Sequence, residues 1–249
     1  MRESVILRET FRVSVELASI VLPVYNQESH IQAVLEEYVS GLDRLHIPFE
    51  LLPVVNGPRR DRSLEICHEL QSKFRCIRTL CIDGGGWGRA VRFGLSEARG
   101  DLLCFTNSAR TTSRDLLLAL VYGSVHEDAV IKANRKIRAG TGRRLGSLIY
   151  NLECRALFDL PYWDINGTPK VFSRSLSQLL ELTRNDDLID LEFNIICRRA
   201  DYPVIEIPIF SSKRHSGKST TSLNSAFDMY LGAWQLYRAL PKKPRPSER

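Results

Sequence analysis

The sequence has 249 residues, of which 43% are hydrophobic and 26% charged, and its formal net charge is +6. This composition excludes a disordered or fibrous chain and is sufficient for a large core. The basic excess favours anionic partners such as nucleotides, phosphates or an acidic membrane surface. The six cysteines form no Cys-x-x-Cys pair, which argues against zinc and predicts mostly buried, reduced thiols.

Charged residues interrupt the apolar runs at the N-terminus, and the longest apolar stretch, near Leu116–Val125, is too short to span a bilayer. We therefore expect a cytoplasmic protein without a leader, with at most a peripheral membrane contact through its terminal helix and tail. The chain is expected to form one domain over residues 1–240, with an extension at 1–17 and a basic, Pro-rich, disordered tail at 241–249.

Apolar patterning predicts strands that alternate with helices in the first half of the chain. The strands are expected at 19–24, 49–55, 76–82 and 101–105, and the helices near 31–42, 64–70, 90–98 and 115–122. A looser second half predicts a strand at 128–133, a helix around 145–152, a strand at 202–210 and a helix at 222–240. The alternation predicts an α/β fold with a mostly parallel, doubly wound sheet.

Three strands end in polar loops, "PVYNQES" (23–29), "VVNGPRRD" (54–61) and "FTNSAR" (105–110). In a parallel sheet these ends meet over one crevice, where ligands bind. The segment "DGGGWGRAVRFG" (83–94) adds glycines and a helix start whose N–H groups suit an anion. It fails as Gly-x-Gly-x-x-Gly because Val91 takes the third glycine position, and no P-loop is present. A tight turn before a helix explains the glycines equally well.

Taken in order, seven segments resemble the family 2 glycosyltransferases of the GT-A fold, in particular the dolichol-phosphate mannose synthase and polyprenyl-phosphate glycosyltransferase branch. The resemblance covers roughly residues 18–238, and each segment alone is a weak signal. The segments are "SIVLPVYNQESHI", "VVNGPRRD", "GWGRAVRFGLSEARGDLLCFTNSARTTSRDL", "DINGTPKVFSR", "DLEF", "EIPI" and "KRHSGKS".

This resemblance implies transfer of a sugar, with inversion, from a nucleoside diphosphate sugar to an acceptor, most simply a polyprenyl phosphate. A phosphate acceptor is already anionic and needs no strong general base, whereas an alcohol would. For catalysis or sugar binding we expect Asp164, which heads the acceptor segment, and Asp190. For the acceptor phosphate we expect Arg135, Arg143 and Ser147, the last two sharing a helix face. The residues expected at the nucleotide sugar are Pro23, Tyr25, Asn26, Glu28, Asn56, Arg89, Asn107, Ser108, Arg110, Arg214, His215 and Lys218.

The sequence departs from the family at its carboxylates. Asn56 replaces the first nucleotide-binding aspartate, and Asn107-Ser108-Ala109 replaces the Asp-x-Asp that binds a divalent metal. Because an amide and a hydroxyl are poor ligands for a hard cation, we predict no metal site, and Mg²⁺ or Mn²⁺ is poorly supported as a cofactor. Arginines would then meet the diphosphate through bidentate contacts. The candidates are Arg59, Arg60, Arg89 and Arg110, with the loop Arg214–Lys218 adding charge.

The loss of carboxylates leaves an alternative open: a catalytically degenerate relative that binds a nucleotide or a partner protein. The acceptor segment and the basic loop favour the enzyme instead. Nucleic acid is not an expected partner, because the basic residues gather in loops and no recognition motif is present.

Overall fold

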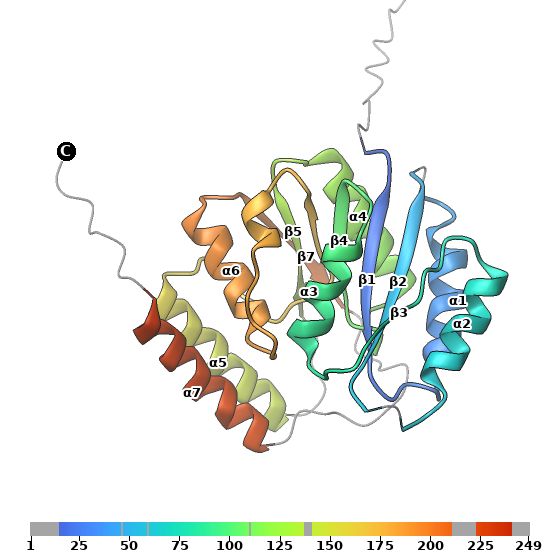
Figure 1. Ribbon diagram of the computed structural model, residues 1–249. Coiled ribbons are helices and arrows are strands. Elements are labelled where there is room, and N and C mark those ends of the chain that lie inside the picture. Colours follow the sequence, from blue (N-terminus) through green and yellow to red (C-terminus); the bar gives the residue numbers. More distant parts are fainter. Residues whose placement is uncertain are drawn as a thin grey trace, which may run out of the picture.

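The computed structural model describes residues 15–45, 47–58, 60–109, 111–136, 141–210 and 223–240, without the side chains of 141–144 and 223–227. Strands and helices alternate through most of this range (Figure 1). Their bounds are β1 Ala18–Val24, α1 Ile31–Leu42, β2 Phe49–Asn56, α2 Ser63–Lys73, β3 Leu80–Ile82, α3 Trp87–Glu97, β4 Leu102–Phe105, α4 Ser113–Val125, β5 Val130–Arg135, α5 Thr141–Phe158, β6 Lys170–Ser173, the 3₁₀ helix η1 Ser177–Leu180, α6 Ile189–Arg199, β7 Val204–Ile209 and α7 Leu223–Ala239.

The strands form one seven-stranded sheet in the order β3-β2-β1-β4-β6-β5-β7. β1 is buried along its whole length, as its continuous apolar sequence predicts for a central parallel strand. It pairs in parallel with β2, from Ala18 opposite Phe49, and with β4, from Ala18 opposite Leu102. Only β6 among these strands runs antiparallel to its neighbours. The predicted α/β class with a mostly parallel sheet is therefore confirmed.

Helices cover both faces of the sheet and enclose two apolar cores. α1 turns its buried stripe, which includes Ile31, Leu35 and Tyr38, into the core shared with α2 and α4. α3 and α6 pack over the opposite face, in front of the sheet in Figure 1. Gly94 permits the close approach of α3, because a Cβ there would lie 2.3 Å from Cγ1 of Val21. α5 and α7 lie side by side at one end of the molecule.

One predicted strand is shorter in the structure, and two predicted helices are longer. The strand expected at 76–82 shortens to β3, with a single bridge at Ile77. The helix expected at 115–122 begins earlier because Thr112 caps it, its side chain accepting the Asp115 N–H at 3.1 Å. The helix expected around 145–152 extends over the 18 residues of α5. No helix in the described ranges is long and apolar enough to cross a membrane.

The structure tests the predictions for the cysteines and for the two chain ends only in part. Of the six cysteines, Cys67, Cys104, Cys154 and Cys197 are buried, which confirms the expectation for most of them, but Cys81 is exposed. The predicted extension lies largely outside the described residues, and the predicted tail lies wholly outside them.

Candidate functional site

The loops after β1, β2 and β3 converge at Gly57. This glycine has a φ of +78°, and a Cβ there would lie 2.9 Å from Cε2 of Tyr25 and 3.3 Å from Cα of Gly85. Pro23 is buried opposite Val54 inside the sheet, whereas Tyr25 is partly exposed. The ends of β1 and β2 thus meet as expected, joined by the glycine-rich loop after β3, and the Tyr25 ring is partly exposed there.

The side chain of Asn56 joins these three loops by hydrogen bonds. It is buried, and Nδ2 donates to the carbonyls of Val24 (2.9 Å) and Val54 (3.3 Å). Its Oδ1 accepts the Gly86 N–H at 3.3 Å. Both N–H donors of the amide are thus committed to backbone carbonyls, so Asn56 holds the ends of β1 and β2 to the glycine-rich loop.

Glu28 and Asp61 join the first two loops by reciprocal hydrogen bonds. The Glu28 N–H donates to Asp61 Oδ2 at 2.9 Å, and the Arg62 N–H donates to Glu28 Oε2 at 2.8 Å. Burial raises the pKa of Asp61, but the hydrogen bonds from Glu28 and Ser63 outweigh it and the net shift is downward. A small pocket lies against this junction, lined by Asn26, Val55, Asn56, Pro58, Asp61 and Leu64.

The loop after β4 is folded on itself. Asn107 Oδ1 accepts the Ala109 N–H at 2.8 Å, and the carbonyl of Asn107 accepts the Thr111 N–H at 3.2 Å. The Ser108 hydroxyl is buried and donates to Gln27 Oε1 at 2.6 Å. The three positions that replace Asp-x-Asp therefore offer no carboxylate, and their side-chain oxygens are already hydrogen-bonded.

The start of α3 is less open than the sequence predicted. The Arg89 N–H donates to the Asn185 carbonyl at 3.1 Å, so this amide is not free for an anion. The 184–186 segment lies so close that a Cβ on Gly88 would be 2.5 Å from the Arg184 carbonyl oxygen. The Arg89 side chain is exposed and lies over Gly84, where a Cβ would be 1.9 Å from Nη1. A cation thus borders the glycine-rich loop.

An ion pair holds the acceptor segment to the end of β5. Arg135 donates through Nε to Asp164 Oδ2 (2.7 Å) and through Nη2 to Oδ1 (2.8 Å), while its N–H also reaches Oδ2 (3.0 Å). Burial alone would lower the pKa of Arg135, but the Asp164 carboxylate reverses this and raises it. Glu206 accepts the N–H groups of Trp163 and Asp164 and pairs with buried Lys132 at 3.1 Å.

Asp190 lies in a second buried ion pair. Its Oδ1 contacts the ammonium of Lys170, and its Oδ2 accepts from Nε1 of Trp87 at 3.1 Å. Lys170 is fully buried at the start of β6, directly opposite Lys132 of β5. Both carboxylates predicted to be catalytic, Asp164 and Asp190, are therefore neutralised by cations.

The helix predicted to bind an acceptor phosphate also carries an apolar surface. α5 contains Arg143 and Ser147 in its first turns, and Ser147 is half-buried. Large exposed apolar side chains lie on the same helix, beside and beyond Ser147, and more lie on neighbouring α7. These exposed residues, called here the α5–α7 apolar surface, are Leu145, Leu148, Ile149, Leu152, Leu231, Trp234 and Tyr237.

Several predicted residues cannot be located. Arg59, Arg110, Arg214, His215 and Lys218 lie outside the described residues, as does the side chain of Arg143. Conversely, sequence reasoning missed Lys132, Lys170, Glu206 and Trp87. A lysine inside an otherwise apolar strand was the available signal for Lys132, because such a charge is buried only with a partner.

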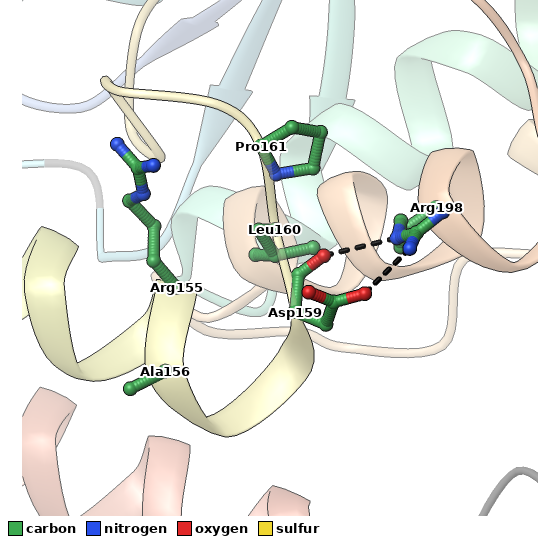
Figure 2. A pocket seen from close by; sticks show the side chains of 6 residues that line it. All are labelled: Arg155, Ala156, Asp159, Leu160, Pro161 and Arg198. Atoms are coloured by element: carbon green, nitrogen blue, oxygen red, sulfur yellow. Dashed lines mark hydrogen bonds and ion pairs between the residues drawn. The ribbon is translucent and has the colours of Figure 1, made fainter. Parts of the chain in front are cut away.

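The larger cavity lies away from the strand ends (Figure 2). It has a volume of about 480 Å³ and is bounded by the last turns of α5 and α6 and the loop between α5 and β6. Arg198 donates to the carbonyl and carboxylate of Asp159, and Arg155 points away from that pair and packs 3.9 Å from the centre of the Trp163 ring. None of the residues predicted to bind the nucleotide sugar or the acceptor lines it.

Solved structures share this fold. Glucosyl-3-phosphoglycerate synthase from Mycobacterium tuberculosis, in complex with Mn²⁺, uridine diphosphate and phosphoglyceric acid, superposes with a TM-score of 0.69 at 16% identity, covering 94% of this chain and 82% of that one. The same enzyme with Mn²⁺, UDP-glucose and phosphoglyceric acid gives 0.70 at 15% identity, covering 94% and 83%. The fold is GT-A.

Curated relatives match most of the chain. Undecaprenyl-phosphate 4-deoxy-4-formamido-L-arabinose transferase from Pseudomonas paraeruginosa is 25% identical over 86% of this chain and 64% of its own length. Its counterpart from Pectobacterium atrosepticum is 25% identical over 85% and 65%. The chain thus spans just under two thirds of these relatives. The family model "Glycosyl transferase family 2" matches residues 19–179, and the chain belongs to this family.

Proposed function

We propose that the protein transfers a sugar from a nucleoside diphosphate sugar to a polyprenyl phosphate with inversion. The observation that carries the proposal is the composition of α5. The residues predicted for the acceptor phosphate, Arg143 and Ser147, lie on the helix that also exposes Leu145, Leu148 and Leu152. A lipid phosphate likewise combines an anionic head with an apolar chain. The curated relatives, named as undecaprenyl-phosphate transferases, support the same acceptor class.

The chemistry needs little from the protein beyond placement and charge. An acceptor phosphate oxygen attacks the anomeric carbon, a new carbon–oxygen bond forms, and the bond to the diphosphate breaks with its electron pair on the leaving oxygen. No proton has to be removed from the acceptor. This agrees with the ion pairs at Asp164 and Asp190, because neither carboxylate is needed as a base. We assign Asp164 to positioning Arg135, whose guanidinium would face the acceptor phosphate.

The α5–α7 apolar surface further supports a peripheral membrane contact. Single exposed apolar residues are common on soluble proteins, but seven large ones on two neighbouring helices indicate a surface that contacts another apolar phase. A bilayer surface that covered them would bring the lipid phosphate to the first turns of α5. The residues Lys242, Lys243 and Arg245 follow α7 in the sequence and would add attraction to anionic lipid.

Acceptor selectivity tests the proposal. The purified chain is incubated with a panel of nucleoside diphosphate sugars in detergent micelles that contain either undecaprenyl phosphate or undecaprenol, and release of the nucleoside diphosphate is measured. We expect release that depends on the phosphate and not on the alcohol. Equal release with both lipids, or with neither, would contradict the acceptor assignment.

A further inference from the structure

We propose that this chain binds the diphosphate of its donor without a divalent cation, an inference that rests on the proposed function. The family resemblance implies a metal between Asp-x-Asp and the diphosphate. The two glucosyl-3-phosphoglycerate synthase structures compared above contain Mn²⁺. The residues of this chain do not fit such an ion, for reasons that come from the hydrogen bonds of the loops and not only from the missing carboxylates.

The loop after β4 offers no side-chain ligand for a divalent cation. The Asn107 oxygen is engaged by the Ala109 N–H, and the buried Ser108 hydroxyl is engaged by Gln27. Ala109 is itself buried and carries no polar group. To bind a cation the loop would have to break these contacts and would still offer only neutral oxygens, which Mg²⁺ and Mn²⁺ bind poorly without an anionic partner.

Neighbouring carboxylates do not replace the missing pair. Asp61 uses Oδ2 for the Glu28 N–H and Oδ1 for the Ser63 N–H. Asp115 uses Oδ2 for the Thr112 hydroxyl at the start of α4. Within the described ranges, no group of three His, Cys, Asp or Glu side chains could hold a metal ion. Asp61 and Asp115 are therefore engaged in local hydrogen bonds, and the described carboxylates of this region do not assemble into a metal site.

A side chain of the crevice can supply the opposing charge instead. Arg89 is exposed, its guanidinium lies over Gly84, and it makes no ion pair with any described residue. Guanidinium binds phosphate oxygens through two parallel hydrogen bonds and is always charged. Arg60 is likewise exposed in the loop after β2. We assign Arg89 to the donor diphosphate, with Arg60 as a secondary contributor.

Calorimetric titration tests the proposal on the full chain. UDP, GDP and CDP are titrated in EDTA and in Mn²⁺, and the nucleotide that binds most tightly is carried forward. The dissociation constant in EDTA should be within threefold of that in Mn²⁺. Arg89→Gln should weaken binding about tenfold or more, as expected when a charge-assisted bond is lost. Arg75→Gln changes an exposed arginine in the connection that leads into β3, at the end of the strand opposite the glycine-rich loop, and should leave binding unchanged.

The outcomes separate this inference from the proposed function. Binding that disappears in EDTA and returns with Mn²⁺ would overturn the metal-free site while leaving a glycosyltransferase intact. Metal-independent binding that Arg89→Gln leaves unchanged would overturn the assignment of Arg89. No nucleotide binding in either buffer would overturn the proposed function, and this inference with it.

Discussion

At the scale of single residues, Asn56 and Asn107 use their amides differently. Both occupy positions where the resembled family has aspartate. Asn56 needs its N–H groups, because Nδ2 donates to the carbonyls of Val24 and Val54 while Oδ1 accepts the Gly86 N–H. Asn107 is an acceptor, because its Oδ1 receives the Ala109 N–H. An aspartate could replace the second amide but not the first, since a carboxylate has no N–H to give.

This difference predicts unequal effects of the same substitution. Asn56→Asp should lower the free energy of unfolding by about 2 kcal/mol, because two buried carbonyls lose their donor and face a carboxylate. Asn107→Asp keeps its hydrogen bond and should change stability by less than about 0.5 kcal/mol. Urea unfolding of both variants measures the difference. Equal effects would contradict the hydrogen-bond assignment at Asn56.

The Arg135–Asp164 pair makes a second prediction. Arg135→Gln, Asp164→Asn and the double variant form a cycle that isolates the interaction of the two side chains. We expect a coupling free energy of about 1.5–3 kcal/mol, because the pair has two direct side-chain hydrogen bonds and its carboxylate is buried. Chemical denaturation of the four proteins provides the measurement. Additive effects of the two single changes would mean that the pair contributes nothing to stability.

The sequence indicated these residues but not how they are paired. Asp164 and Asp190 were predicted for the site from their place in family-like segments, and Arg135 as a basic residue of the acceptor half. The contacts join positions far apart in the chain, such as Trp87 to Asp190 and Lys170 to Asp190. No local pattern encodes such pairs, and they emerge only when α3, β6 and α6 pack together.

At the scale of helices and strands, the α5–α7 apolar surface predicts a membrane contact that one charge should disrupt. Leu148→Glu puts a carboxylate on α5 where the leucine is 47% exposed, so folding should tolerate it. We expect a several-fold smaller fraction of the variant to float with anionic liposomes at low salt. The matched control is Leu118→Glu on α4, where the leucine is 41% exposed, which should float like the unaltered chain. Equal flotation of both variants would argue against contact through α5.

Elements with continuous apolar runs were predictable, and short polar ones were not. β1, β2 and β4 lie within a residue of their predicted bounds, because buried parallel strands have unbroken apolar sequences. β6 was not predicted as a strand, since it has only four residues and begins with Lys170. Lys170 can be buried there because it pairs with Asp190 of α6. The local sequence of β6 does not contain this partner and so does not predict the strand.

At the scale of the whole molecule, the sheet buries opposite charges at neighbouring positions of β5 and β6. Lys132 sits at the centre of this group, paired with Glu206 and hydrogen-bonded to Asn194 at 3.2 Å. Burial lowers the pKa of Lys132 to about 8, although Glu206 opposes the shift. In the unfolded chain the same group titrates near its usual pKa of about 10.4.

The lowered pKa predicts a stability that depends on pH. Between pH 8 and 10 the unfolded chain binds more protons at Lys132 than the folded chain, so this group's contribution to stability rises with pH and is lost as pH falls through 8. The free energy of unfolding, relative to Lys132→Met, should rise by about 1.5 kcal/mol from pH 8 to 9.5. Urea unfolding of both proteins at the two pH values tests this. Parallel pH profiles would contradict a lowered pKa at Lys132.

The most direct measurement for the molecule as a whole is the mass of its lipid product. The purified chain is mixed with liposomes containing undecaprenyl phosphate and with a panel of nucleoside diphosphate sugars, and the extracted lipid is analysed by mass spectrometry. We predict one new lipid species, whose mass equals that of undecaprenyl phosphate plus one glycosyl unit and which carries a single phosphate. A lipid that carries a diphosphate, or an acceptor that stays unchanged with every donor, would contradict the proposed transfer.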